Sequence, residues 1–189
     1  MLLIASRKQP MRLEIANYLA ASFLLEQEPG QWDALVLLDS GMRPTDFVAR
    51  RALSYLYLHF DDIEQSRANK LPPTSTLVGQ ALQFAKGKER LLVSCRAGQG
   101  CSVALAYLIC CRERGVAEAV RLLDPTRHRP NRLVVTLGDA LLDDPEILTQ
   151  FDAWQRANAH IRLSDYIDEI EREFEALEAA GAVDRISGV

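Results

Sequence analysis

Residues 90–111 read RLLVSCRAGQGCSVALAYLICC, and the fold is decided in this stretch. Its mostly apolar beginning, residues 90–94, predicts a buried strand. The glycine-containing segment 95–100 predicts a tight loop, and the apolar residues of 103–111 predict a helix. The stretch therefore places one cysteine, Cys95, at the carboxyl end of a strand and directly before the N-terminus of a helix.

Strands and helices alternate on the N-terminal side of this stretch. Short apolar runs predict two strands, and a further segment, in which side chains alternate between two sides, predicts a third. Two segments with apolar residues at helical spacing predict helices. Such alternation predicts an α/β fold with a mostly parallel central sheet flanked by helices. The predicted strands are residues 2–5, 34–38 and 53–60, and the predicted helices are residues 12–25 and 74–85.

The chain is predicted to be wholly helical after residue 111, with a basic connector at 124–132 in which Asn131 is placed to cap the next helix. The last helix carries a stripe of apolar residues, beginning at Tyr166, which predicts packing against the rest of the molecule. We therefore divide the chain into an α/β domain, residues 1–144, and a helical C-terminal extension, residues 145–189. The predicted helices are 116–123, 133–142, 146–157 and 163–180.

Composition narrows the possible partners and location. The chain has 189 residues, a net charge of −4 and a pI near 5.4, which argues against nucleic-acid binding through a basic face. The apolar N-terminus is too short for a signal peptide and no run reaches transmembrane length, so a cytoplasmic protein that does not enter membranes is predicted. Its four cysteines are expected to be reduced, and their spacing with the histidines predicts no metal site. The sequence leaves the oligomeric state open.

The loop after Cys95 combines the parts of a nucleophilic oxyanion site. The positive end of a helix favours a thiolate over a thiol. The backbone N–H groups of a tight loop bind phosphate-like anions, and Gly98 and Gly100 give the backbone the freedom to curl in this way. Ser102 is placed to donate a hydrogen bond to sulfur. Asp61 and Asp62, which follow the strand at 53–60, are candidates to protonate a leaving oxygen.

Residues 94–102, SCRAGQGCS, resemble the signature of the cysteine-based protein tyrosine and dual-specificity phosphatases, HC-x-x-G-x-x-R-S/T. The resemblance runs from about residue 34 to residue 142 and is closest to the compact bacterial and dual-specificity branches. It implies the fold of that family and a two-step hydrolysis of phosphate monoesters through a phosphocysteine, without a metal or cofactor. The implied substrate is a phosphorylated protein or a small phosphate ester.

The resemblance also implies roles for single residues. Cys95 matches the nucleophile, and Ser102 matches the hydroxyl that assists its departure. Asp62 or its neighbour Asp61 matches the general acid; in extended chain they project to opposite sides, so only one can face the cysteine, and we take Asp62. The phosphate-binding residues implied by the signature are Arg96, Ala97, Gly98, Gln99, Gly100 and Cys101.

Two positions depart from the signature. Ser94 stands in place of the histidine, and we expect its hydroxyl to keep a hydrogen bond there. Cys101 stands in place of the arginine whose planar guanidinium binds two phosphate oxygens. Loss of such a transition-state donor costs about a hundredfold to a thousandfold in rate. Arg96 is expected to point outward, and the basic connector at 127–132 is a candidate source of another guanidinium.

Three functions remain open on this sequence. The first is a phosphatase of reduced activity. The second is a pseudophosphatase that binds phosphorylated ligands or other oxyanions without turnover, and the third is a rhodanese-like sulfur-transfer or redox domain. For Cys101 we prefer an inert residue over a disulfide partner of Cys95, because two cysteines six residues apart need not meet.

Overall fold

The computed structural model describes residues 10–187 of the chain. Its centre is a four-stranded sheet in the order β1-β4-β2-β3, in which every neighbouring pair of strands is parallel. The predicted α/β class with a parallel central sheet is therefore confirmed. The strands are β1 (Arg12–Ala16), β2 (Asp33–Leu38), β3 (Ser54–His59) and β4 (Arg90–Ser94).

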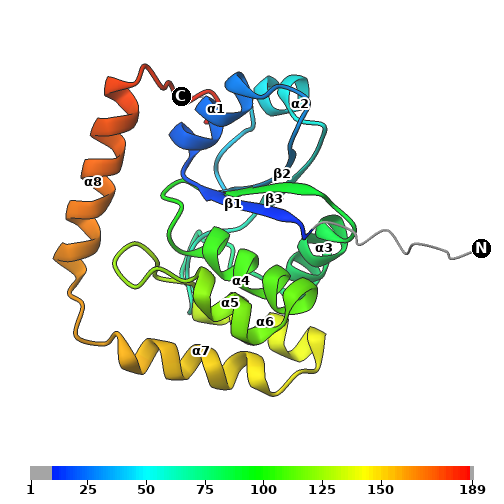
Figure 1. Ribbon diagram of the computed structural model, residues 1–189, viewed down its shortest axis with the longest axis vertical. Coiled ribbons are helices and arrows are strands. Elements are labelled where there is room, and N and C mark those ends of the chain that lie inside the picture. Colours follow the sequence, from blue (N-terminus) through cyan, green and yellow to red (C-terminus); the bar gives the residue numbers. More distant parts are fainter. Residues whose placement is uncertain (1–9, 188–189) are drawn as a thin grey trace, which may run out of the picture.

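Helices cover both faces of the sheet (Figure 1). On β2, Leu35 and Leu37 belong to the core shared with α3 to α6, whereas Val36 and Leu38 belong to the core shared with α1 and α2. This alternation is expected of a strand that is buried on both faces. The helices over one face are α1 (Tyr18–Gln27) and α2 (Phe47–Arg51); those over the other are α3 (Ser75–Ala85), α4 (Cys101–Arg114), α5 (Val116–Leu122) and α6 (Arg132–Leu142).

Helix α4 is the central helix of the larger core. Its first eleven residues, from Cys101 to Cys111, are all buried. A helix buried all round has no freedom to shift relative to the sheet, because close-packed side chains surround it on every side. The packing of α4 therefore fixes the position of its N-terminus, which is where the cysteine loop enters the helix.

The N-terminal end of the described chain corrects one prediction. Residues 12–25 do not form one helix: Arg12–Ala16 is the edge strand β1, paired in parallel with β4, and the helix begins only at Tyr18. Asn17 separates the two elements by capping α1, where its side-chain oxygen accepts a hydrogen bond from the N–H of Ala20 at 2.8 Å. The strand predicted at residues 2–5 lies outside the described residues.

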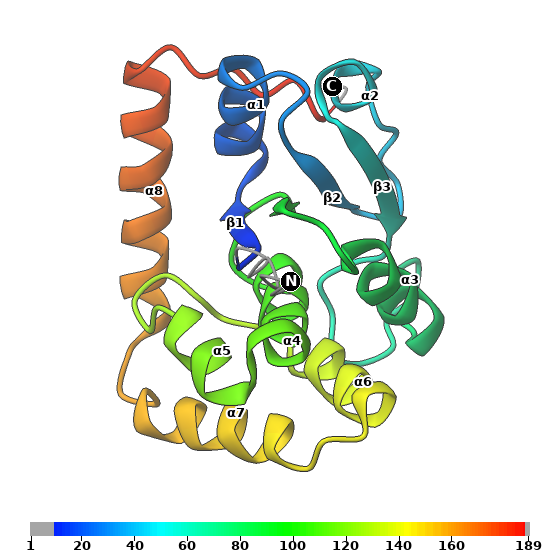
Figure 2. The ribbon, with the colours of Figure 1, turned by 45° about the vertical axis from the view of Figure 1, so that its right-hand side comes forward.

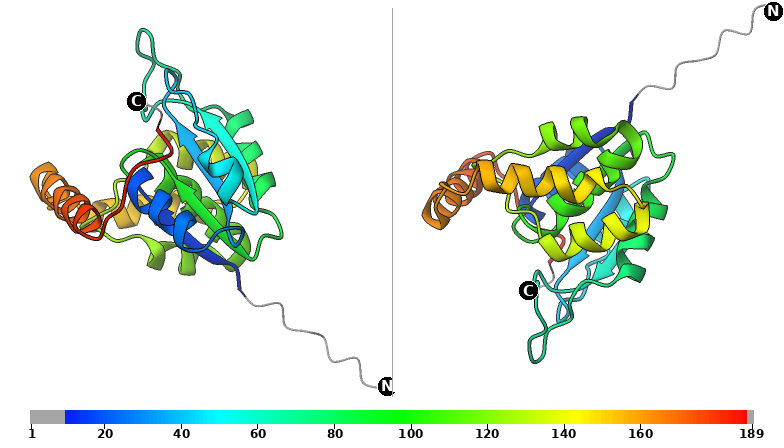
Figure 3. Two further views of the ribbon diagram at one scale, coloured as in Figure 1. Left: turned by 90° about the horizontal axis from the view of Figure 1, so that it is seen from above. Right: turned by 90° about the horizontal axis from the view of Figure 1, so that it is seen from below.

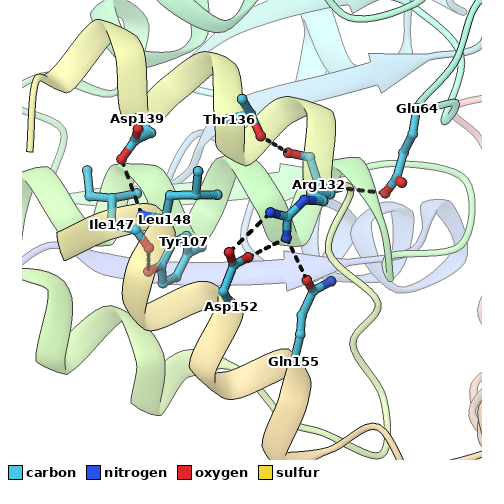
Figure 4. A network of polar contacts seen from close by, with 9 residues as sticks. All are labelled: Glu64, Tyr107, Arg132, Thr136, Asp139, Ile147, Leu148, Asp152 and Gln155. Carbon is cyan, nitrogen blue, oxygen red and sulfur yellow. Dashed lines mark hydrogen bonds and ion pairs between the residues drawn. The ribbon is translucent and has the colours of Figure 1, made fainter. Parts of the chain in front are cut away.

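Helix α7 (Glu146–Ala157) begins directly after the predicted domain boundary and packs beneath α5 and α6 (Figure 2). Its residues Ile147 and Phe151 are buried in the core that contains α4. The hydroxyl of Tyr107 on α4 donates to the carbonyl oxygen of Ile147 at 2.8 Å, which joins the two helices further (Figure 4). The division of the chain into residues 1–144 and 145–189 stays a prediction.

Helix α8 (Leu163–Ala179) runs along one side of the molecule (Figures 1 and 3). Its apolar stripe is only partly covered, since Tyr166 is 8% exposed but Ile167 is 46% exposed. The segment after α8 returns to the sheet, where Ile186 is buried in the core beside α1 and Ser187 forms an antiparallel bridge with Pro44. Among the helices of residues 10–187, none is long and apolar enough to cross a membrane.

Candidate active site

The carboxyl ends of the four strands meet at one edge of the sheet, because all strands run in the same direction. Each strand is followed there by a polar or nucleophilic residue. Asn17 follows β1, Asp39 follows β2, and Cys95 follows β4. Asp61 and Asp62 come just after β3. The structure thus brings together, at this edge, the cysteine and the acidic pair that the sequence singled out.

The loop from Cys95 to Gly100 is pressed against the end of β1. The N–H of Cys95 donates to the carbonyl oxygen of Ala16 at 3.4 Å. Gly98 has a φ of +69°, and a Cβ at that position would lie 2.6 Å from the backbone nitrogen of Asn17. Only glycine combines this backbone conformation with so close an approach. Gly98 therefore fixes the curl of the loop against the neighbouring strand.

The curled loop leaves a run of backbone donors unpaired. In the described part of the chain, no protein acceptor takes a hydrogen bond from the N–H groups of residues 96–102. The first backbone hydrogen bond of α4 runs from Ala104 to the carbonyl oxygen of Gly100, at 3.0 Å. Unpaired N–H groups at a helix N-terminus attract an anion through both their hydrogens and the helix dipole. The loop has the chemistry of a phosphate cradle.

Cys95 and Ser102 face each other across this loop. The Sγ atom of Cys95 lies 3.0 Å from the Oγ atom of Ser102. Ser102 is fully buried in the first turn of α4, whereas Cys95 is partly exposed. The serine hydroxyl is therefore held in a fixed place beside a sulfur that a ligand can reach.

The two neighbouring aspartates have different surroundings. Asp61 is 2% exposed and accepts hydrogen bonds from Lys70 Nζ at 2.9 Å and from the N–H of Leu71 at 2.8 Å. Burial opposes ionisation of Asp61, but hydrogen bonds from Ser40, Lys70 and Leu71 outweigh burial and lower its pKa to about 2. Asp61 is thus held as an anion near neutral pH and ties the segment after β3 to the turn at Lys70.

Asp62 is exposed and lies against the cysteine loop. A Cβ at Gly100 would overlap the Oδ2 atom of Asp62, so the absence of a side chain there lets the carboxylate approach the loop. Its other oxygen, Oδ1, accepts a hydrogen bond from Asn131 Nδ2 at 2.7 Å. Of the two aspartates, Asp62 is the one that faces the cradle.

Asn131 is a site residue that the sequence indicated only as a helix cap. It does cap α6, where its Oδ1 atom accepts from the N–H of Val134 at 3.0 Å. In addition its own N–H donates to the carbonyl oxygen of Gly100 at 3.3 Å, and its side-chain amide holds Asp62. One side chain thereby connects the loop, the exposed aspartate and α6.

The two departures from the signature have clear structural consequences. Cys101 is 3% exposed; burial raises the pKa of its thiol, and the nearby charge of Asp62 raises it further. It lies at the start of α4 as a neutral thiol. The hydroxyl of Ser94 is fully buried and has no hydrogen-bond partner among the residues described, so the hydrogen bond expected there is not formed. The cause is strand alternation, which turns Ser94 to the same face as Leu92, into the apolar core beside α1.

The arginines near the site differ in their partners. Arg96 is exposed, with its guanidinium 3.8 Å from Asp39, as expected for a side chain that points outward. In the basic connector, Arg127 is paired with Glu173 of α8 at 2.6 Å. The guanidinium of Arg132 is paired with Asp152 of α7 (Figure 4). Arg129 donates its N–H to the carbonyl oxygen of Gln99 at 2.9 Å, so the connector does fold onto the loop.

A cavity of about 530 Å³ lies on the Asp62 side of the loop. Cys95 does not line it, so the cavity adjoins the cradle rather than containing the sulfur. In residues 10–187, no cluster of three or more His, Cys, Asp or Glu side chains is arranged to hold a metal ion. The cavity is lined by Asp62, Ile63, Glu64, Gln65, Arg67, Ala97, Gln99, Gly100, Arg129 and Asn131.

No protein-family model matches the chain, and no curated protein matches it. Among solved structures, the chain is similar to the crystal structure of Tk-PTP in the active form, with a TM-score of 0.45 and 18% identity over 73% of this chain and 92% of that chain. It is also similar to the crystal structure of PTPMT1 in complex with PI(5)P, with a TM-score of 0.45 and 13% identity over 75% of this chain and 92% of that chain.

Proposed function

We propose that the protein is a cysteine-dependent phosphatase that hydrolyses phosphate monoesters through a phosphocysteine at Cys95. One observation carries this proposal: a partly exposed cysteine lies at a strand end, at the entrance to a loop whose N–H groups, at residues 96–102, are unpaired. Unpaired N–H groups of a tight loop at a helix N-terminus bind phosphate-like anions, and here they lie beside a nucleophile. The substrate that fits is a phosphorylated protein or a small phosphate ester.

The first chemical step breaks the ester. The Cys95 thiolate attacks phosphorus and forms an S–P bond, while the P–O bond to the leaving group breaks. Asp62, in its protonated form, gives its proton to the departing oxygen. The N–H groups of the loop hold the three other phosphate oxygens and the charge that they carry.

The second step restores the thiolate. Water attacks phosphorus, the S–P bond breaks, and the Asp62 carboxylate accepts a proton from the water, so that phosphate is released and the acid is again protonated. The hydroxyl of Ser102, 3.0 Å from sulfur, donates a hydrogen bond to the departing thiolate. The side-chain amide of Asn131 orients Asp62 through its Oδ1 atom, which leaves Oδ2 directed at the loop.

The neutral thiol of Cys101 explains why the proposed rate is reduced. It offers no planar pair of donors for two phosphate oxygens, and removing one such donor costs about a hundredfold to a thousandfold in kcat. We expect Cys101→Arg to raise kcat/KM for an aryl phosphate at least tenfold. Cys101→Ser, which keeps the size of the side chain, is the control and should leave the rate near that of wild type.

The rate of phosphate release from phenyl phosphate tests the proposal. Wild type should release phosphate slowly, and Cys95→Ser should release none. Phosphate release that survives in Cys95→Ser contradicts the mechanism. Binding of inorganic phosphate without turnover in wild type, with turnover appearing in Cys101→Arg, instead identifies a pseudophosphatase, the alternative that the thiol at position 101 favours.

The sulfur-transfer or redox function stays a prediction, and a separate experiment tests it. Burial and Asp62 keep the Cys101 thiol protonated, and a thiol attacks a disulfide or persulfide only as its thiolate. A persulfide on Cys95 after incubation with thiosulfate, detected by mass spectrometry, would support this function over phosphate hydrolysis.

A further inference from the structure

Two carboxylates and two guanidiniums line the cavity beside the cysteine loop; each carboxylate accepts a hydrogen bond from a neutral donor, and in the part of the chain that the structure describes neither guanidinium forms an ion pair. Asp62 accepts from Asn131 at 2.7 Å. Glu64 accepts from the N–H of Arg132, at the start of α6, at 2.8 Å (Figure 4). Within the described residues, neither Arg67 nor Arg129 has a carboxylate within ion-pair distance. The guanidiniums of Arg67 and Arg129 are therefore the charged donors of this cavity that no carboxylate of the described chain pairs.

Arg129 is the cation that the connector directs to this cavity. Its basic neighbours are occupied: Arg127 and Arg132 form ion pairs. His128 is mostly neutral at physiological pH, because burial lowers its pKa to about 4. Arg129 lines the 530 Å³ cavity and also an adjoining cavity of about 330 Å³.

Two contacts hold Arg129 in place. Its backbone N–H is bonded to Gln99 of the loop at 2.9 Å. Its guanidinium carbon lies 5.2 Å from the centre of the ring of Tyr166, on α8, which is a cation–π distance. A stacked guanidinium keeps its N–H donors free at its edge, where a carboxylate or phosphate can accept two of them. Tyr166 is thus a positioning residue for Arg129.

We propose that this cavity is a second anion subsite, and that the preferred substrate is a small phosphate ester with a second anionic group. The scissile phosphate occupies the loop, and Arg129 and Arg67, which both line the cavity, bind the second phosphate or carboxylate. Ala97, Gln99 and Gly100 belong to both the loop and the cavity wall, so the two groups lie on one small molecule. A volume near 530 Å³ is in the range of small-molecule sites. This inference rests on the proposed phosphatase function.

The test compares three substrates that differ only in the second group: phenyl phosphate, 3-carboxyphenyl phosphate and 1,3-phenylene bis(phosphate). The quantity measured is a ratio for each of the two substrates with a second anionic group: its kcat/KM divided by the kcat/KM of phenyl phosphate. We expect a ratio above one for the preferred group. In Arg129→Gln that ratio should fall roughly tenfold, because one charged, hydrogen-bonded contact at an exposed site is lost. Arg67→Gln and Tyr166→Leu should lower the ratio less.

The control is Arg121→Gln, which removes an exposed arginine of α5 that is paired with Glu118 and lies outside the cavity lining. It should leave the ratio unchanged. Comparison of the ratios for the two substrates with a second anionic group decides whether phosphate or carboxylate is preferred. If turnover is too slow to measure, the same ratio is obtained from dissociation constants for Cys95→Ser measured by calorimetry.

The outcomes separate the two proposals. If phenyl phosphate is hydrolysed or bound but the second group brings no preference, or Arg129→Gln keeps the preference, the subsite is overturned and the phosphatase stands. If Arg129→Gln lowers all three values equally, Arg129 serves the scissile phosphate and the subsite is also overturned. If phenyl phosphate is neither hydrolysed nor bound, both proposals fail.

Discussion

At the scale of single residues, Gly98 and Gly100 serve the site in different ways. Gly98 needs a left-handed backbone, with a φ of +69°, and lies against the end of β1. Gly100 leaves room for the Asp62 carboxylate. The sequence showed that the loop needs glycines but not what lies against each one, because the contacting residues are tens of positions away along the chain.

Replacing Gly98 tests its contact with β1. We expect Gly98→Ala to lower the free energy of unfolding by about 2–4 kcal/mol, as strain at a positive φ is combined with a clash against the backbone of Asn17. Gly87→Ala is the matched control: it has a φ of +75° but nothing within 4 Å of an added Cβ. Urea denaturation of both variants checks this, and equal losses would contradict the close contact.

Asp61 and Asp62 should separate stability from activity. Asp62→Asn should lower kcat for phenyl phosphate about a hundredfold or more, because the proposed general acid is lost. The urea midpoint should stay near that of wild type, because an amide oxygen at position 62 can still accept the hydrogen bond from Asn131. Asp61→Asn should shift the midpoint instead. A large rate loss in both variants, with unchanged stability in both, would contradict the assignment.

The pH dependence of stability gives an independent test of Asp61. Its pKa is lowered from 3.8 to about 2 in the folded protein, so the unfolded chain binds the proton first as pH falls. Its stabilising contribution is therefore present above pH 4 and is lost as pH falls from about 4 to about 2. Urea unfolding across this range should show a shallower loss of stability in Asp61→Asn than in wild type.

At the scale of elements, β4, its loop and α4 could be predicted because each has a single consistent pattern. A five-residue segment with three apolar residues at its centre is followed by a glycine loop and then by a helix whose first eleven residues are buried. β1 could not be separated from α1, because its alternation is short, with Leu13 and Ile15 as its alternating apolar residues, and runs almost directly into the apolar pattern of α1. Only the pairing with β4 and the cap at Asn17 separate the two elements.

The link between α6 and the loop also escaped the sequence, since Asn131 and Asp62 are 69 positions apart. Asn131→Asp tests this link, because it keeps an oxygen to cap α6 but loses the amide donor to Asp62. We expect a lower kcat and an alkaline limb of the pH–rate profile shifted to higher pH, since a second carboxylate raises the pKa of its neighbour. Stability should fall near neutral pH, because two carboxylates then face each other at a buried position, and should recover as pH falls. Asn131→Ala, which adds no charge but loses the cap, should lose about 1 kcal/mol of stability at all pH values. A pH–rate profile identical to that of wild type in Asn131→Asp would show that Asn131 only caps α6.

At the scale of the whole molecule, the C-terminal segment joins the two sides of the sheet. α7 belongs to the core that contains α4, α8 contributes Tyr166 and Glu173 to the connector beside the loop, and Ile186 enters the core beside α1. The sequence predicted these helices, but their positions depend on contacts between distant segments that no local pattern encodes.

The seating of the C-terminal segment can be measured through Ile186. Ile186→Ala should lower the free energy of unfolding by about 2–4 kcal/mol, because the side chain is fully buried. Ile167→Ala, at a position of α8 that is 46% exposed, should change stability by no more than about 0.5 kcal/mol. A loss at Ile186 no larger than that at Ile167 would show that the segment does not pack on the core.

The central claim, that Cys95 is a nucleophile in a phosphate cradle, is tested most directly by trapping the phosphocysteine. Wild-type protein turning over phenyl phosphate is quenched in acid, digested and analysed by mass spectrometry. We predict one phosphoryl group on the peptide that contains Cys95, and none on the corresponding peptide of Cys95→Ser. An unmodified Cys95 in wild type, with phosphate release that persists in Cys95→Ser, would contradict the claim.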